Sequence, residues 1–108
     1  MDAETKALYR RKAAVAAALG HPLRLAVVEV LRDGEQCVCD IAARLGAQRS
    51  NVSRHLAVMV RAGVLVARKD GLRMLYTLRA PCAVRFLDCV ADVLREQMRE
   101  DAAVLEKL

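Results

Sequence analysis

The sequence lacks the features that mark several large classes of protein. No apolar run approaches the roughly 18 residues that a membrane span requires, and the charged N-terminus has no signal-peptide core. Internal repeats and low-complexity tracts are absent as well. There are no paired carboxylates, no nucleophile–base arrangement and no glycine-rich phosphate loop, so no enzyme is indicated. We therefore expect a non-enzymatic protein of the cytoplasm that does not bind a membrane.

The length and composition limit the number of domains and the chemical roles that the cysteines can have. A chain of 108 residues allows one domain, residues 1–108, with a modest core that a second subunit would enlarge. A hydrophobic content of 56% with 29% charged residues is typical of a folded, soluble protein. In the cytoplasm, four cysteines indicate metal binding or redox chemistry rather than structural disulfides.

The positive charge is concentrated in one part of the chain. Residues 49–79 hold seven Arg or Lys against one Asp, a balance of +6. From Phe86 to the end there are three basic and six acidic residues, a balance of −3. A localised cationic surface of this kind is typical of nucleic-acid binding.

Two short amphipathic segments in the middle of the chain predict a helix-turn-helix. Apolar side chains recur at helical spacing in residues 37–46, which end at Gly46, and in residues 48–63, which end at Gly63. The stripes are Val38, Ile41 and Leu45 in the first segment and Val52, Leu56, Met59 and Val60 in the second. Two such helices around a tight turn, over residues 37–63, would place the second helix in a DNA major groove.

The polar face of the second segment carries the groups that we expect to contact DNA. They are hydrogen-bonding side chains mixed with cations, as readout of base edges and phosphates requires. The candidate DNA-binding residues here are Arg49, Ser50, Asn51, Ser53, Arg54, His55 and Arg61.

A hairpin is predicted directly after this segment. Residues 64–68 and 73–78 have strand character and flank Asp70-Gly71, a strong signal for a two-residue turn. Such strands form a wing, residues 64–79, beside the DNA-reading helix. Arg68, Lys69 and Arg73 surround its tip and are placed to touch phosphates or the minor groove.

Apolar helices are predicted at both ends of the chain. Residues 3–19 place Leu8, Val15 and Leu19 on one side, and a second helix starts at His21-Pro22. Pro81 opens a long final helix whose apolar stripe is Phe86, Leu87, Val90, Val93, Leu94 and Met98. The fold class is mainly α with a small β-hairpin, a winged helix-turn-helix. Residues 1–19 and 81–108 are expected to form a homodimer, which would present two reading helices to successive major grooves.

Cys37 and Cys39 lie at the start of the first helix of the motif. Asp40 follows Cys37 by three residues, as the acidic member of a capping box follows its Ser or Thr. A thiol caps a helix poorly, and giving up a good cap costs on the order of 1 kcal/mol, so another use for the sulfur is indicated. Residues two apart on a helix point about 200° apart. If both sulfurs bind one ion, the first turn must therefore be irregular or must unwind, which is a route from ligand to DNA release.

Cys82 and Cys89 lie two turns apart on one face of the final helix. They either complete a metal site or act as packing residues. Sulfur ligands without a nearby histidine suit soft ions. Tetrahedral zinc favours four ligands, whereas a three-sulfur site suits pyramidal arsenite or antimonite.

These motifs resemble those of the ArsR/SmtB family of bacterial metalloregulators, over nearly the whole chain and most closely the arsenic repressors. The motifs on which the resemblance depends are Leu19-Gly-His-Pro-Leu-Arg-Leu25, Cys37-Val-Cys-Asp40, Ser50-Asn-Val-Ser-Arg-His-Leu56, Ala62-Gly-Val-Leu65 and the Asp70-Gly71 turn. The resemblance implies a homodimeric winged-helix repressor that binds double-stranded operator DNA without a cofactor. It also implies that As(III) or Sb(III), or Cd/Pb/Zn in a sister group, binds at Cys37 and Cys39 and releases the DNA.

The chain departs from the family pattern at several positions. Ala42 stands where arsenic members often carry a third cysteine, so Cys82 or Cys89 would have to supply that sulfur. Residues 1–36 contain no cysteine, unlike the cadmium and lead members, and Val93 stands where a zinc-binding histidine is expected. Arg49 replaces a common Gln, which would alter operator preference.

Three other functions remain open at this stage. A thiol redox or persulfide sensor would pair Cys37 or Cys39 with Cys82 or Cys89. A Cd/Pb-responsive repressor would have the same fold. A winged-helix protein-interaction module would have no affinity for duplex DNA, whereas a repressor would bind DNA with a steep salt dependence.

Overall fold

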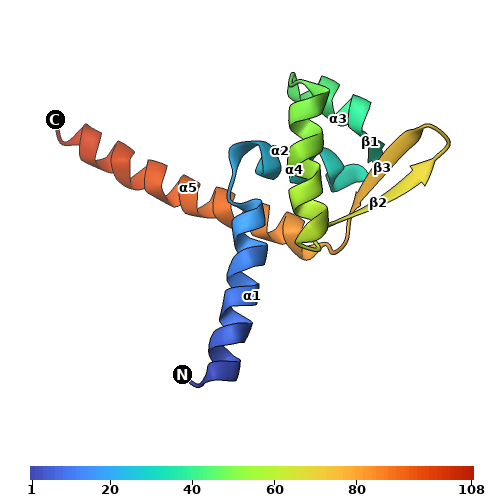
Figure 1. The fold of residues 1–108 in the computed structure, drawn as a ribbon. Coiled ribbons are helices and arrows are strands. Elements are labelled where there is room, and N and C mark those ends of the chain that lie inside the picture. The colour runs from blue at the N-terminus through green and yellow to red at the C-terminus, as the bar shows by residue number, and fades with distance from the viewer.

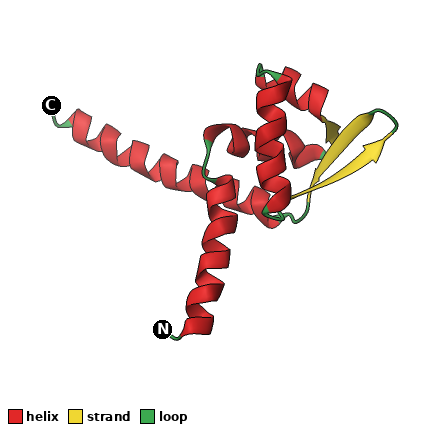
Figure 2. Ribbon diagram, in the orientation of Figure 1, coloured by secondary structure: helices red, strands yellow, loops and turns green.

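The computed structural model describes all residues, 1–108, as six helical segments and three short strands. In chain order these are α1 (Ala3–Leu19), α2 (Pro22–Val30), the 3₁₀ turn η1 (Leu31–Asp33), β1 (Gln36–Cys37), α3 (Val38–Leu45), α4 (Arg49–Arg61), β2 (Leu65–Asp70), β3 (Arg73–Leu78) and α5 (Cys82–Glu106). Figure 2 shows how little of the chain is strand. The mainly helical fold with a small wing is confirmed.

The body of the molecule is built from α2, α3, α4 and the sheet, and the two terminal helices project from it (Figure 1). Its core is aliphatic and contains no buried charged side chain. The largest fully buried side chains are Val27, Val28, Ile41, Val52, Leu56, Met59 and Leu65. Every buried side chain of the two predicted apolar stripes therefore points to one shared core under α3 and α4.

Local sequence explains where the helices start. Asp2 caps α1, since its carboxylate accepts a hydrogen bond of 2.7 Å from the Thr5 amide. His21 caps α2 through Nδ1, which accepts from the Leu23 amide at 3.1 Å, and Pro22 fills the first helical position. The expectation that His21 starts a helix is thus confirmed.

The sheet contains one strand more than the hairpin that the sequence predicts. β2 and β3 form the antiparallel wing, and the short β1 pairs with the other edge of β3, giving the order β1-β3-β2. In this register Gln36 lies opposite Tyr76 and Cys37 opposite Leu75. The segment that precedes α3 is therefore part of the wing sheet.

The predicted turn is displaced by one residue. Asp70 pairs with Arg73, so the two-residue loop is Gly71-Leu72 and not Asp70-Gly71. Gly71 has φ +62°, and no other residue of this turn has a positive φ. A II′ turn requires the left-handed region only at its first central position, whereas a turn centred on Asp70-Gly71 would force Asp70 there as well. The observed loop thus needs a positive φ at a single residue, and that residue is a glycine.

The terminal helices leave their apolar faces without a partner in the single chain. Of the predicted stripe of α1 only Leu19 is buried, while Leu8 and Val15 are exposed. Four exposed apolar side chains follow the stripe of α5, namely Phe86, Val93, Leu94 and Met98. By length and apolar composition no single helix qualifies as a membrane span; only the bent pair Ala3–Leu19 and Pro22–Asp33, with 79° between its parts, does so together.

Candidate DNA-binding surface and thiol site

α4, the reading helix of the motif, has one buried and one polar face. Val52, Leu56 and Met59 are each 0% exposed and fix the helix against the body. Since these residues recur every three or four positions, the side chains between them must face outward. Figure 1 shows α4 beside α3, with the end of α4 leading into β2 of the wing.

The predicted DNA-binding residues lie on α4 and the wing, and most are exposed. The exposed ones are Arg49, Ser50, Ser53, Arg54, Arg61, Arg68, Lys69 and Arg73, whereas Asn51 and His55 are half-buried. Arg54 Nη2 donates to Asn51 Oδ1 at 3.1 Å, which orients both side chains on the same turn. Arg49, Arg61 and Lys69 have no ion-pair partner, so their charges are available to phosphates.

Arg68 is held more closely than the other cations of the wing, since Arg73 lies 3.9 Å from Asp70 and Lys69 has no ion-pair partner. Arg68 Nε and Nη2 donate to the two carboxylate oxygens of Glu35 at 2.7 and 2.6 Å, a bidentate pair. These hydrogen bonds lower the pKa of Glu35, so the carboxylate stays charged. The sequence analysis missed Glu35, since no local pattern links residues 33 positions apart. A phosphate would have to compete with this carboxylate for Arg68.

His55 is turned toward α2 instead of lying among the exposed cations. Its ring packs against that of His21 at a tilt of 38°, with 4.3 Å between centroids, and its Nδ1 accepts from Arg24 Nε at 3.1 Å. Arg24 also donates to the Ala17 carbonyl at 3.3 Å. These contacts join α1, α2 and the reading helix. They also bring Arg24 near Arg54. Arg24 is a cation that the sequence analysis did not single out.

The contact between His21 and His55 leads to a prediction of how stability depends on pH. Burial, followed by the charges of His21, Arg24 and Arg54, lowers the pKa of His55 below 6.5. The unfolded chain therefore takes up a proton at a higher pH than the folded chain, and the free energy of unfolding falls as pH drops through about 6.5. Urea titrations from pH 7.5 to pH 5 are expected to show this loss, and a smaller one in His55→Gln, whose amide oxygen still accepts from Arg24. Equal losses in both proteins would contradict the assignment.

The two thiols at the start of α3 have different surroundings. Cys37 is the N-cap residue, with extended backbone and no side-chain capping hydrogen bond, and it is buried. Cys39, two positions later, is exposed. The predicted capping position of Cys37 appears in the structure, just outside the regular helix, and the two thiols differ in exposure.

Cys82 and Cys89 lie elsewhere, both exposed on α5. All four cysteines are free, and no three Cys, His, Asp or Glu side chains of the chain gather at a distance that holds a metal ion. The structure therefore does not bring the four predicted ligands together within one chain. A three-sulfur site would require movement or a sulfur from a second subunit.

The comparisons with known proteins identify the family. The family described as bacterial regulatory protein, arsR family, matches residues 21–66, from α2 into β2. The uncharacterized HTH-type transcriptional regulator Rv0081 of Mycobacterium tuberculosis is 36% identical over 106 residues, covering 97% of this chain and 93% of that protein. This chain belongs to the arsR family. The resemblance drawn from its motifs is confirmed.

Solved arsR-family structures share the fold along most of the chain. The homodimeric winged helix-turn-helix DNA-binding domain of Mb0332 from Mycobacterium bovis, a possible ArsR-family regulator, superposes with a TM-score of 0.80 and 27% identity, covering 93% of each chain. The crystal structure of Rv0081 gives a TM-score of 0.76 with 33% identity, covering 88% of this chain and 96% of that one. The antimony-specific transcriptional repressor AntR gives 0.76 with 27% identity, covering 92% and 90%.

Proposed function

We propose that this arsR-family protein is a cytoplasmic homodimeric repressor that releases its operator when As(III) or Sb(III) binds cysteine thiolates. The observation that carries the proposal is the position of Cys37, a buried thiol at the N-cap of α3 and within the wing sheet. A soft ion bound there would act on α3, which supports α4, and on the wing sheet, and these are the two parts proposed to contact DNA. The likeness to an antimony-specific repressor supports the class of effector.

The dimer would form through the exposed apolar faces of α1 and α5. Val93, Leu94 and Met98 are 54%, 48% and 67% exposed in the single chain, and α1 adds Leu8 and Val15. A group of exposed apolar side chains along two helices of a small domain is typical of an interaction surface. Its likeness to a homodimeric winged-helix domain supports a second copy as the partner. We further propose that residues 1–19 and 81–108 serve dimerisation, residues 37–63 DNA reading and residues 64–79 the wing.

DNA binding would use the polar face of α4 and the wing. Arg54 is held by Asn51 on the exposed side of the helix, where it can reach base edges or phosphates. The unpaired charges of Arg49, Arg61 and Lys69 would add the salt-dependent attraction.

Replacement of Arg54 by alanine tests this surface. We expect operator affinity to fall by about 5- to 150-fold, the equivalent of about 1–3 kcal/mol, without a change in unfolding midpoint. The matched control is Arg99→Ala, because Arg99 is also exposed but lies on α5 and pairs with Glu96. Fluorescence anisotropy with a labelled promoter fragment measures both. Equal affinities of wild type and Arg54→Ala would contradict the proposed surface.

Effector binding would begin at Cys39, the exposed thiol, and then recruit Cys37 from the core. Drawing the buried Cys37 to the ion that the exposed Cys39 holds would distort the first turn of α3. The third sulfur would be Cys82 or Cys89, from the same or the partner subunit. The distorted α3 then no longer supports α4 in the pose that fits the major groove.

A titration of the operator complex distinguishes the effectors. We expect arsenite under reducing conditions to release the labelled promoter, and Sb(III) to act alike. Cadmium or lead acting at lower concentration than arsenite would favour the Cd/Pb alternative. Release by polysulfide or an oxidant alone would favour a thiol redox or persulfide sensor, which three exposed free thiols also support. Absence of duplex DNA binding at low salt would favour a protein-interaction module.

A further inference from the structure

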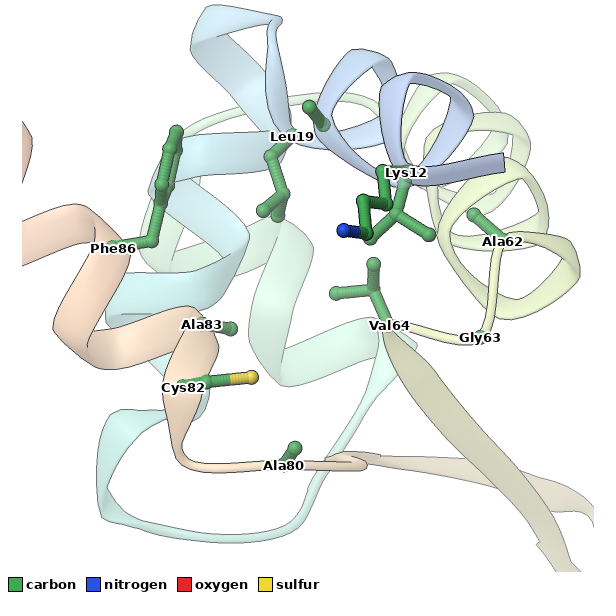
Figure 3. A pocket seen from close by; sticks show the side chains of 11 residues that line it. Lys12, Leu19, Ala62, Gly63, Val64, Ala80, Cys82, Ala83 and Phe86 are labelled. Carbon is green, nitrogen blue, oxygen red and sulfur yellow. The ribbon is translucent and has the colours of Figure 1, made fainter. Parts of the chain in front are cut away.

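A cationic hollow lies beside the reading helix, apart from the apolar hollow shown in Figure 3. Most of the apolar wall belongs to the terminal helices that are proposed to form the dimer, so a second subunit is expected to cover it. The cationic one, which we call the α2–α4 hollow, has a volume of about 310 Å³. Its wall lies outside residues 1–19 and 81–108 and consists of Arg24 of α2 and Asn51, Arg54, His55 and Val58 of α4. The proposed dimer interface therefore does not include it.

The positive charge of the α2–α4 hollow is not compensated within the chain. The hollow contains the guanidinium groups of Arg24 and Arg54 and no carboxylate. Neither arginine forms an ion pair, and the side-chain hydrogen bonds of both end on neutral acceptors. Burial, followed by the charges of His21, Arg24 and Arg54, lowers the pKa of His55, so that its ring is neutral near pH 7. An anion bound between the two arginines would relieve their mutual repulsion.

Arg24 is held in place before any ligand binds. Its Nε donates to His55 Nδ1 at 3.1 Å and its Nη1 to the Ala17 carbonyl at 3.3 Å, while Nη2 makes no hydrogen bond within the chain. Arg54 is restrained in a similar way by Asn51, which leaves its Nε and Nη1 free. Because folding already orders these side chains, binding an anion costs less conformational entropy than it would at an unrestrained arginine.

We propose that Arg24 and Arg54 together bind one phosphate group of the DNA backbone, beside the groove that α4 reads. Guanidinium groups suit phosphate because they present several donors in one plane, and both arginines have donors to spare. A phosphate contact carries no sequence information, but it sets the register of a reading helix on the duplex. Arg24 is thereby a DNA contact on α2, outside the helix-turn-helix and the wing. This inference rests on the proposed binding of duplex DNA.

A scan of single methylphosphonates along a labelled operator fragment tests the contact. Each substitution replaces one charged phosphate oxygen by a methyl group. Wild-type affinity is expected to fall about tenfold at the phosphate that Arg24 and Arg54 share. Arg24→Gln should bind the unmodified duplex about tenfold more weakly, and at that one position it should lose only about two- to threefold more, through Arg54 alone. If the two proteins lose affinity by the same factor at every position, the contact is overturned.

The salt dependence of binding separates a phosphate contact from a general loss of charge. Arg24→Gln is expected to lower the slope of log affinity against log salt concentration by about 0.9 for each subunit. The matched control is Arg10→Gln, because Arg10 is exposed on α1, forms no ion pair and lies outside the hollow. The slope of the control should equal that of the wild type. Equal slopes for the two variants would overturn the proposal.

Arg24→Lys distinguishes a DNA contact from a purely structural role of Arg24. Lysine keeps a charge that can reach the phosphate, but its single ammonium group cannot reproduce the planar set of donors that holds His55 and Ala17. We expect this variant to keep the wild-type salt slope, with an affinity between those of the wild type and Arg24→Gln. A slope as low as that of Arg24→Gln would leave Arg24 only a structural role and overturn the proposal.

The wild-type protein offers a measurement that does not depend on how the variants fold. In correlation spectra of the arginine Nε–H groups, the operator duplex is expected to shift the signals of Arg24 and Arg54 saturably, whereas inorganic phosphate at the same ionic strength should not. A saturable response to inorganic phosphate alone would make the hollow a site for a free anion. That result, or no response of Arg24 to the duplex, overturns the proposal.

The failure of this inference can be told apart from failure of the proposed function. Arsenite should release Arg24→Gln from the operator by the same factor as the wild type, because the thiols of α3 are unchanged. Duplex binding to which Arg24 contributes nothing overturns the phosphate contact alone. A wild-type protein that binds no duplex at low salt overturns the repressor itself, and the phosphate contact with it.

Discussion

Cys39→Ser is expected to bind the operator as tightly as the wild type and to stay bound when arsenite is added. Cys39 is exposed and contributes nothing to the core, so the fold and the surface of α4 should be unaffected. Arsenite should weaken wild-type binding by about 5- to 150-fold, the usual range of coupling between two sites. In the variant this ratio should approach one.

The control for Cys39→Ser is Ala43→Ser, which places a hydroxyl at another exposed position of α3. It should keep both operator binding and release. Cys37→Ser should behave like Cys39→Ser in release, with some change in stability because Cys37 is buried. Ordinary release by arsenite in both cysteine variants would remove these thiols from the sensing site.

Leu56→Ala is expected to lower the free energy of unfolding by about 2–5 kcal/mol. Leu56 is 0% exposed and anchors the middle of α4 to the core, so its truncation leaves a cavity beneath the reading helix. The urea midpoint should fall at fixed protein concentration, a condition that matters if the protein is a dimer.

Leu72→Ala is the control for this loss, since Leu72 occupies the wing turn and is fully exposed. Its unfolding free energy should change by no more than about 0.5 kcal/mol. Similar midpoints for Leu56→Ala and wild type would mean that the core under α4 is not what holds the motif together.

The sequence predicts well whatever depends on neighbours along the chain. The stops at Gly46 and Gly63, the start at Pro22 and the capping position of Cys37 follow from local backbone preferences and helical periodicity. The wing also follows from local signals, and its turn is misplaced by one residue because Asp-Gly and Gly-X are both favoured two-residue loops.

Contacts between distant segments could not be predicted in this way. The strand at Gln36–Cys37 is only two residues long and exists because β3 offers it an edge. The pairs Glu35–Arg68 and Arg24–His55 join residues more than 30 positions apart. Such pairs depend on how the helices and strands pack. From the sequence alone, Arg68 and His55 are therefore predicted to be as free to contact DNA as the unpaired cations of α4.

The backbone ladder between Cys37 and Leu75 has a consequence for protein engineering. A sensor segment grafted from another arsR-family protein would carry with it one residue pair of the neighbouring sheet. A chimaera joined outside Gln36 with its length preserved retains that pair. A chimaera joined between Cys37 and Cys39, or lengthened by a residue, would shift the pairing of this segment with β3. Loss of its regulatory response would then reflect a damaged wing and not a poor choice of ligand.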